Sequence, residues 1–546
     1  MIWTSRAGLV LRDLVPAGRR REWVNRGYCP DRDLYALFAA HVREHPDRPA
    51  VIDPAGALDY SGLDARVRRI AAALAEADLG PRDVVGIQLP NGRDAVAAEL
   101  AVAAVGALAL PYQTGGGHRD ALSLLGRSRA SAVITTTPAA EALAAHRPSL
   151  PHLGTVLVFG TAPSGCRSLD PWLAGRTDVP WRPAPIDPEA PTRILTSSGT
   201  EAEPKMVAYS HNALAGGRGN YLRALSCGAD PPRNLVLVPL ATSYGSLGTP
   251  VTLARHGGTL LLLDVFDPVA ALRMVAAHRP THLYGVPTML RRIADQPCVP
   301  GEDTGSLRAA VSSGAALDRA TAVAAGTRLG CRVINVYGSS DGANCHTASG
   351  TAIPGTTRLG RPDPAVAALV IADRDGPVGP GQPGEIWALG PMTPLCYVGA
   401  PEMDTSHRAP GGWVRTGDRG MIDAAGYLHV LDRMRQVVIR GGYNISPAEV
   451  ERQIRAHPAV ADAACVAVPD PDLGQRLCAC IAPRPGSAPV TLAGLNGFLE
   501  NERGLERRKL PELLVVLPEL PLGAAGKVCR QTLARLAAHR HGAAIR

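Results

Sequence analysis

Residues 432–451 of the chain read D-R-M-R-Q-V-V-I-R-G-G-Y-N-I-S-P-A-E-V-E. The end of this stretch predicts a helix start, because the Ser446 hydroxyl can cap a helix, Pro447 suits its first position and Glu449 adds a carboxylate to its first turn. Upstream, from Gly360, the chain is dense in Gly and Pro and carries short β runs. The quoted stretch therefore marks the return from a β-rich region to an α/β pattern.

Short apolar strands alternate with helices before Gly360, which is typical of βαβ units with parallel sheets. We expect helices at 32–48, 61–74 and 94–108, and strands at 84–89, 131–135, 235–238, 259–263 and 332–336. A final helix is expected at 531–539. We therefore predict an α/β fold: a large N-terminal domain of αβ subdomains with a small β-rich subdomain, 1–431, then a small α/β C-terminal domain, 432–546.

The composition describes an ordinary soluble globular protein, with 46% hydrophobic and 19% charged residues. The net charge of +8 is spread along the chain, so it does not indicate nucleic-acid binding. The longest apolar stretch, 95–110, is too short to span a bilayer, and no secretion signal is visible at the N-terminus. Eleven cysteines without a C-x-x-C pair suggest reduced thiols and a cytoplasmic location, with no membrane partner.

Lysine is rare in this chain: of the 57 basic residues only Lys205, Lys509 and Lys527 are lysines. A compact ammonium on a flexible stem does work that a planar guanidinium does not, so these three residues are functional candidates. Lys205 follows the hydroxyl-rich loop 196–200, and Lys527 follows the turn 521–526. Lys509 is interpreted as structural.

The loop Thr196-Ser197-Ser198-Gly199-Thr200 can wrap phosphate oxygens with its hydroxyl and backbone N–H groups. Lys205 would add positive charge beside them. A G-x-x-x-x-G-K-[ST] motif is absent, so this is not a Walker A loop. By itself the pattern also fits a simple hydroxyl-capped turn with a surface lysine.

The loop, with Pro204 and Lys205 after it, resembles the phosphate loop of the superfamily of acyl- and aryl-acid adenylating enzymes, which includes acyl-CoA synthetases, nonribosomal peptide adenylation domains and luciferases. The likeness recurs in order over residues 35–535. Glu201 and Ala202 depart from it, since the family usually has Thr and Gly there. Asp341 and Gly523 also depart, replacing the usual Glu and Thr.

The resemblance assigns a nucleotide-binding set. Segment 311–317 would lie against adenine, Tyr337 would stack on it, and Asp418 would bind the ribose. Lys205, Arg433 and Lys527 would be catalytic, Lys527 by bridging carboxylate and α-phosphate. The implied nucleotide-binding residues are Thr196, Ser197, Ser198, Gly199, Thr200, Lys205, Gly314, Ala315, Tyr337, Gly338, Ser340, Asp418, Arg433 and Lys527.

The resemblance also implies a metal ion and a domain rotation. Asp341 would bind Mg²⁺, for which a hard oxygen ligand near phosphates is suited. Arg435 falls on the hinge about which a mobile C-terminal domain would turn. That rotation would withdraw Lys527 and bring the Gly441-Gly442 loop towards a thiol.

The activity implied is ATP-dependent adenylation of a small aryl or acyl acid, followed by thioester formation with CoA or a carrier-protein phosphopantetheine. The acid pocket would be lined by Ser243, Tyr244, Tyr284, Gly314 and Asn344. His346, beside it, is interpreted as an ordinary loop histidine. Segment 23–28 faintly resembles aryl-acid ligases and favours an aromatic substrate.

Two alternatives remain at this point. The altered loop 201–203 leaves room for an enzyme that adenylates nitrite and diazotises an aromatic amine. A nucleotide-binding protein without turnover is the other alternative, although Lys527 in its motif argues against it. The expected partners are a small carboxylic acid and an acyl carrier protein, in a monomer or a homodimer.

Overall fold

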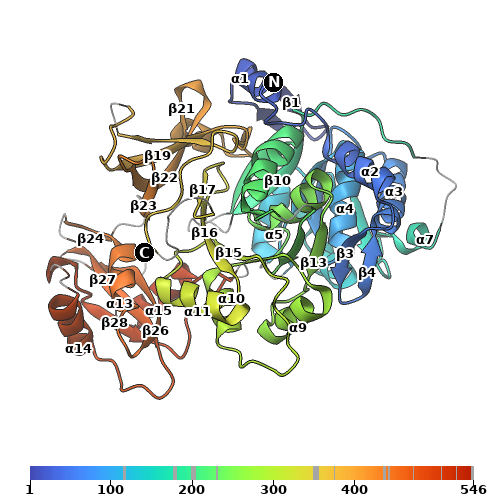
Figure 1. The fold of residues 1–546 in the computed structure, drawn as a ribbon. Coiled ribbons are helices and arrows are strands. Elements are labelled where there is room, and N and C mark those ends of the chain that lie inside the picture. Colours follow the sequence, from blue (N-terminus) through green and yellow to red (C-terminus); the bar gives the residue numbers. More distant parts are fainter. Residues whose placement is uncertain are drawn as a thin grey trace.

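The computed structural model describes the chain apart from residues 115–117, 176–180, 198–203, 229–230, 349–355, 374–375, 434–437, 441–442, 471–472, 504, 506, 524–525 and 543–546. Three bodies can be followed in Figure 1: paired αβ subdomains, a β-rich subdomain beside them, and the C-terminal elements α13 to α15 below it. These bodies match the predicted large domain of subdomains followed by a smaller domain. The boundary at 431–434 itself stays a prediction.

The first eight-stranded sheet is parallel from β10 through β6, β5, β7 and β8 to β9, and antiparallel where β11 joins β10 and β20 joins β11. Its strands in spatial order are β20 (Cys396–Tyr397), β11 (Lys205–Ser210), β10 (Pro191–Ser197), β6 (Leu108–Pro111), β5 (Val84–Gln88), β7 (Ala132–Thr136), β8 (Thr155–Phe159) and β9 (Arg167–Ser168).

The second eight-stranded sheet is parallel from β16 to β3 and antiparallel at both edges. Its strands in spatial order are β17 (Asn344–His346), β16 (Arg332–Gly338), β15 (Ala309–Ser313), β14 (His282–Gly285), β12 (Arg233–Val236), β13 (Thr259–Leu262), β3 (Pro49–Asp53) and β4 (Gly56–Asp59). Some buried side chains of the first sheet form a separate core, whereas one continuous core contains buried side chains of both sheets.

Helices α2 (Leu34–Glu44), α3 (Tyr60–Glu76) and α4 (Arg93–Ala104) pack against one another and contribute to this core. The predicted helix 94–108 is too long, because Gly106 takes a left-handed φ of 74° and the chain then enters β6. The predicted helix 32–48 is shorter as well, since the Asp33 side chain caps its first turn and the helix ends at Glu44.

The remaining elements of the large domain flank the sheets or lie near the N-terminus. They are β1 (Ile2–Thr4), β2 (Val10–Arg12), α1 (Ala17–Asn25), α5 (His118–Arg127), α6 (Thr137–Ala144), α7 (Asp170–Leu173), the π-helices η2 (Ala213–Arg218) and η4 (Gly248–Arg255), the 3₁₀ turn η3 (Gly245–Leu247), α8 (Gly219–Leu225), α9 (Pro268–His278), α10 (Pro287–Ala294), α11 (Arg319–Leu329) and α12 (Pro401–His407).

The β-rich subdomain is an antiparallel sheet with its own small core. It consists of β18 (Ala368–Ala372), β19 (Gly384–Leu389), β22 (Trp413–Ile422), β21 (Arg408–Ala409) and β23 (Leu428–Arg433). This sheet confirms the β-rich region that the Gly- and Pro-dense sequence predicts.

The C-terminal part has a sheet with a separate core on each face. Its elements are β24 (Val438–Arg440), β25 (Tyr443–Ile445), β26 (Val460–Asp470), β27 (Gly474–Pro483), β28 (Leu513–Val516), α13 (Pro447–Ile454), α14 (Leu492–Gly497) and α15 (Arg530–Arg540). The Ser446 hydroxyl caps α13 by accepting from the Glu449 N–H at 3.2 Å. Lys509 donates to both carboxylate oxygens of Glu449, at 2.8 and 3.0 Å, which agrees with a structural role.

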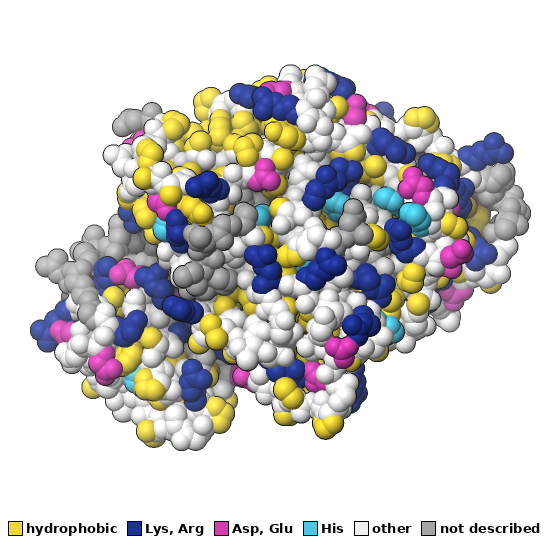
Figure 2. All heavy atoms as spheres, viewed as in Figure 1, with side chains coloured by type: hydrophobic (Ala, Val, Ile, Leu, Met, Phe, Trp, Pro, Cys, Tyr) yellow, Lys and Arg dark blue, Asp and Glu magenta, His cyan; other side chains and the backbone are white. Residues whose placement is uncertain are grey.

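Lys and Arg side chains are distributed over the face that Figure 2 shows, both on the large domain and on the small C-terminal part. Within the described ranges no helix combines the length and the apolar character needed to cross a membrane. The cysteines are free thiols, and Cys478 and Cys480 pack on the same face of β27.

Candidate active site

A cavity of about 160 Å³ lies at the carboxyl ends of parallel strands from both large sheets. In open α/β sheets this edge is where ligands bind, because loops diverge there and leave a crevice. The lining residues are Gln113, Thr196, Lys205, Arg218, Tyr221, Val238, Thr242, Ser243, Tyr244, Val286, Ser313, Gly314, Val336, Gly338, Ser339, Ser340, Asp341, Asn344, Met392 and Lys527. The cavity thus brings together residues from distant parts of the chain.

Both candidate lysines line this cavity. Lys205 begins β11, and Lys527 arrives from the C-terminal part. The Lys527 stem lies against Gly314, where an added Cβ would meet the lysine Cε at 2.9 Å. Gly314 has a φ of +88°, so the backbone conformation and the nearby lysine both require glycine there.

Helix α10 carries the contact that brings Lys527 to the cavity. The Thr288 hydroxyl donates to the Gly526 carbonyl at 3.1 Å, directly before the lysine. The Arg291 guanidinium donates to the Ala461 carbonyl at 3.0 Å, and it lies 3.6 Å from the Asp462 carboxylate. The C-terminal part is therefore docked on α10 with its lysine turned inwards.

Asp341 is a buried carboxylate on the cavity wall. Its Oδ1 accepts from the Tyr397 hydroxyl at 2.6 Å, and its N–H donates to the Ser339 hydroxyl at 3.2 Å. Burial and the adjacent Asp341 raise the pKa of Tyr397, so the phenol stays a donor. The described residues contain no group of three or more His, Cys, Asp or Glu side chains that could hold a metal by themselves. One carboxylate facing a polar cavity fits Mg²⁺, which takes its other ligands from phosphates and water.

Tyr337 and Asp418 meet beside the cavity rather than on its wall. The Tyr337 hydroxyl donates to Asp418 Oδ2 at 2.7 Å. Asp418 in β22 is paired across the strands with Arg433 in β23. Ala315 is exposed and does not line the cavity. The structure thus joins two distant motifs, although their contacts with a nucleotide stay predictions.

Comparison with known proteins agrees with this geometry. Residues 38–398 match the family model described as AMP-binding enzyme, and residues 449–527 match the one described as AMP-binding enzyme C-terminal domain. The chain belongs to the AMP-binding enzyme family. Its resemblance to acid-adenylating enzymes is therefore confirmed.

Relatives match this AMP-binding enzyme over most of its length. Sulfoacetate–CoA ligase of Cupriavidus necator is 32% identical over 505 residues, covering 92% of this chain and 97% of that protein. Salicyl-AMP ligase / salicyl-S-ArCP synthetase of Mycobacterium tuberculosis is 31% identical over 546 residues, covering 95% and 93%. The structure of amide bond synthetase McbA from Marinactinospora thermotolerans superposes with a TM-score of 0.78 and 29% identity, covering 91% of this chain and 99% of that one.

The predicted acid pocket of this AMP-binding enzyme needs one correction. Ser243, Tyr244, Gly314 and Asn344 line the cavity, but Tyr284 does not. Tyr284 is buried in β14 between two neighbouring strands, and its ring meets the edge of the Tyr244 ring with 6.4 Å between centroids. Tyr284 is therefore not among the residues that line this cavity, because its side chain is buried within the second sheet.

Several predicted residues lie outside the part of the chain that the structure describes. They are Ser198, Gly199, Thr200, Glu201, Ala202, Arg435, Gly441 and Gly442. The side chains of Ser197 and Arg433 also lie outside the described part. Thr196, at the start of the loop, lines the cavity. His346 is buried in β17 beside Tyr221 and does not line the cavity, so it is a buried strand residue and not the loop histidine that the sequence suggested.

Sequence reasoning missed the wall formed by Arg218, Tyr221 and Met392. None belongs to a recognised motif. The visible signal was an arginine within the otherwise small and apolar segment 213–219. Arg218 and Tyr221, three positions apart, face the same side of consecutive helical segments.

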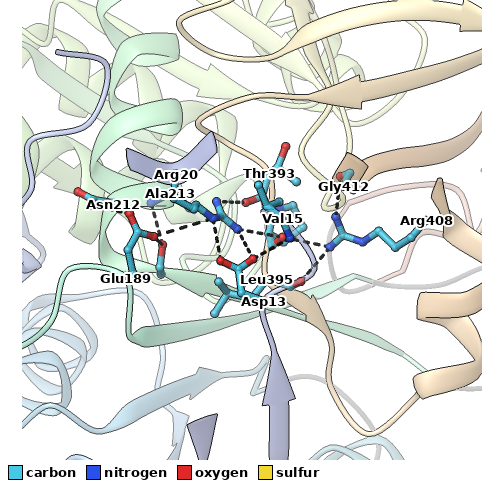
Figure 3. Close-up of polar contacts among 12 residues, drawn as sticks. Asp13, Val15, Arg20, Glu189, Asn212, Ala213, Thr393, Leu395, Arg408 and Gly412 are labelled. Carbon is cyan, nitrogen blue, oxygen red and sulfur yellow. Dashed lines mark hydrogen bonds and ion pairs between the residues drawn. The ribbon is translucent and has the colours of Figure 1, made fainter. Parts of the chain in front are cut away.

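A buried ion network supports the wall near Met392 (Figure 3). Arg20 Nη2 pairs with Asp13 at 2.9 Å, and Arg20 Nη1 donates to the Thr393 carbonyl at 2.9 Å. Arg20 also lies 4.0 Å from Glu189, whose pKa is raised by burial. The network anchors the segment that leads from Met392 into β20, and hence Tyr397, the partner of Asp341.

Proposed function

We propose that this AMP-forming ligase activates a small aryl or acyl acid with ATP, and then transfers the acyl group to the thiol of CoA or of a carrier protein. One observation carries the proposal: Lys527 of the C-terminal part reaches the cavity that Lys205 and Asp341 also line. Two cations and one carboxylate around a polar crevice suit a polyphosphate and its metal ion.

In the first step a carboxylate oxygen of the acid attacks the α-phosphorus of ATP. The new P–O bond gives an acyl-adenylate, and the bond to pyrophosphate breaks. Lys527 would hold the attacking carboxylate against the α-phosphate, and Lys205 would neutralise charge on the leaving pyrophosphate. Asp341 would hold Mg²⁺, which supplies charge neutralisation at the phosphates when bound.

In the second step a thiolate attacks the acyl carbonyl, a thioester forms and AMP leaves. Relatives support both thiols, since one is named as a CoA ligase and another as a salicyl-S-ArCP synthetase. By the family resemblance the C-terminal part would first turn about Arg435. Gly441 and Gly442 would then approach the thiol.

Exchange of radiolabelled pyrophosphate into ATP tests the first step. We expect Lys527→Ala to reduce acid-dependent exchange by roughly 100-fold or more, because an electrostatic contact made in the transition state is lost. ATP binding, followed by equilibrium titration, should remain. Undiminished exchange would reject this role of Lys527.

Lys509→Ala is the matched control, since Lys509 pairs with Glu449 and does not line the cavity. Its exchange rate should equal that of the parent protein. A panel of acids scored with and without CoA then separates the acceptors: CoA consumption indicates a ligase that uses free CoA, and acyl-AMP accumulation indicates a carrier. Activity that requires nitrite and an aromatic amine, with none from carboxylic acids, would favour a diazotase.

A further inference from the structure

Arg218 is a buried cation on the cavity wall. It is the last residue of the π-helix η2, and only 4% of its surface is exposed. A π-helical turn is wider than an α-helical one and re-aims the side chains that follow, and such turns are frequent at functional sites. The guanidinium thus occupies the cavity wall next to Tyr221.

The partners of Arg218 in the described part of the chain are neutral. Its Nη1 donates to the Ser243 carbonyl at 2.9 Å and to the Ser246 hydroxyl at 3.0 Å, and its Nη2 donates to the Ser243 hydroxyl at 3.1 Å. Its guanidinium carbon lies 5.1 Å from the centroid of the Tyr209 ring. Its Nε has no hydrogen-bond partner among the described residues.

Two other buried arginines differ in this respect. Arg193 is paired with Glu99, and Arg20 with Asp13. No carboxylate of the described residues lies within ion-pair distance of Arg218, and the positive charge of Arg193 acts on the same region. Burying a charge without a counter-ion costs desolvation free energy. An anionic group of a ligand that binds beside Arg218 would offset this cost.

The net positive charge of the described cavity wall also favours an anionic ligand. Among the described residues, three cations line the cavity, Lys205, Arg218 and Lys527, against one carboxylate, that of Asp341. The phosphates and the activated carboxylate account for both lysines under the proposed function. Lys527 borders Gly314, whereas Arg218 is held by Ser243 of the predicted acid-binding segment. Arg218 is therefore left for another part of the acid.

We propose that Arg218 selects acids that carry a second anionic group, a carboxylate or a sulfonate, at the end remote from the carboxylate that is activated. The inference rests on the proposed function, because it assigns the substrate class of that same cavity. A guanidinium with its fork partly held by Ser243 and Ser246 can donate its remaining N–H groups to the oxygens of a carboxylate or a sulfonate. An acid spanning the cavity would meet Lys527 at one end and Arg218 at the other.

Pyrophosphate release with paired acids tests this. Each dianionic acid is compared with its own monoamide of equal size: succinate with succinamate, and isophthalate with 3-carbamoylbenzoate. The parent protein should prefer a dianion over its monoamide by about 100-fold in kcat/KM, as expected for a desolvated charge pair. In Arg218→Gln this preference should vanish, mainly through KM. Arg218→Lys, which keeps the charge, should retain part of it.

Arg223→Gln is the matched control, since Arg223 is exposed on the next helix, α8, and should leave the preference unchanged. A monoamide used as well as its dianion by the parent protein overturns the inference. An equal loss for all acids in Arg218→Gln, with a raised KM for ATP, also overturns it, because Arg218 would then bind phosphate. Failure of every carboxylic acid to release pyrophosphate would instead reject the proposed function. Thermal melting of each variant confirms that it is folded.

Discussion

At the scale of single residues, Gly314 shows how closely the cavity depends on one backbone position. Its φ of +88° is unfavourable for any residue with a Cβ, and that Cβ would press on the Lys527 stem. The same residue therefore decides both the local turn and the reach of the lysine. Lys527 can reach the cavity because Gly314, which lies far from it in the sequence, has no side chain.

We expect Gly314→Ala to lower acid-dependent pyrophosphate exchange by at least about 10-fold, because Lys527 is displaced, and to cost about 1 kcal/mol of stability from backbone strain. Gly330→Ala is the matched control. Gly330 also has a positive φ, of +64°, but an added Cβ would meet nothing within 4 Å. It should lose similar stability and keep its exchange rate. Equal exchange in the two variants would show that Lys527 does not need this gap.

At the scale of elements, α10 is the surface on which the C-terminal part rests. Thr288, Arg291 and Arg292 reach across to it, Arg292 lying 3.6 Å from Glu519. These contacts between described residues are polar, and the proposed rotation of the C-terminal part would have to break them. Through these contacts α10 stabilises the position of the C-terminal part in which Lys527 lines the cavity.

Thr288→Val removes the hydrogen bond to Gly526 and keeps the shape of the side chain. We expect pyrophosphate exchange to fall about 3- to 10-fold, the equivalent of one net hydrogen bond of about 1 kcal/mol. Thioester formation from supplied acyl-adenylate should be unchanged, because the domain would then be turned away. Thr405→Val, on the exposed side of α12, should change neither rate. A parallel loss in both half-reactions would contradict a docking role.

At the scale of the whole molecule, three buried histidines make stability depend on pH. Burial lowers the pKa of His211 to about 3 and those of His282 and His346 to about 4, from 6.5. His211 Nδ1 also accepts the Leu34 N–H at 3.1 Å, so its protonation would break the start of α2. Folded histidines stay neutral where unfolded ones become charged.

Stability should therefore fall as pH drops below about 6.5, by up to about 1.4 kcal/mol per pH unit for each histidine, until the folded pKa values near 3 to 4 are reached. Melting temperatures between pH 7.5 and 5 measure this. The slope should be shallower in His211→Asn, whose amide oxygen can accept the same N–H. His152→Asn, at an exposed histidine, serves as the control and should keep the parent slope. An unchanged slope in His211→Asn would contradict the assignment.

Much of the fold could be predicted because it depends on local pattern. Apolar runs marked β5, β7 and β13, and the Ser446 cap marked α13. The predicted helix ends were less accurate. The helix predicted at 94–108 extended into β6, because helix propensity alone does not reveal that β6 pairs with β5 in the sheet. Lys205, Ser340 and Lys527, which the motifs singled out, line the cavity, whereas Tyr284 is buried in the second sheet and does not. Their contacts with ATP stay predictions.

The order of the elements, the family and the two cavity lysines can be read from the amino-acid sequence, because periodicity and motifs depend on residues close together in the chain. The contacts between distant groups depend on the folded molecule: Lys527 with Gly314, Tyr397 with Asp341, and Arg218 with Ser243. Packing of two sheets and a docked C-terminal part sets those contacts, since burial and approach depend on every surrounding element at once. That Arg218 has no carboxylate partner among the described residues can be recognised only when its neighbours in space are known.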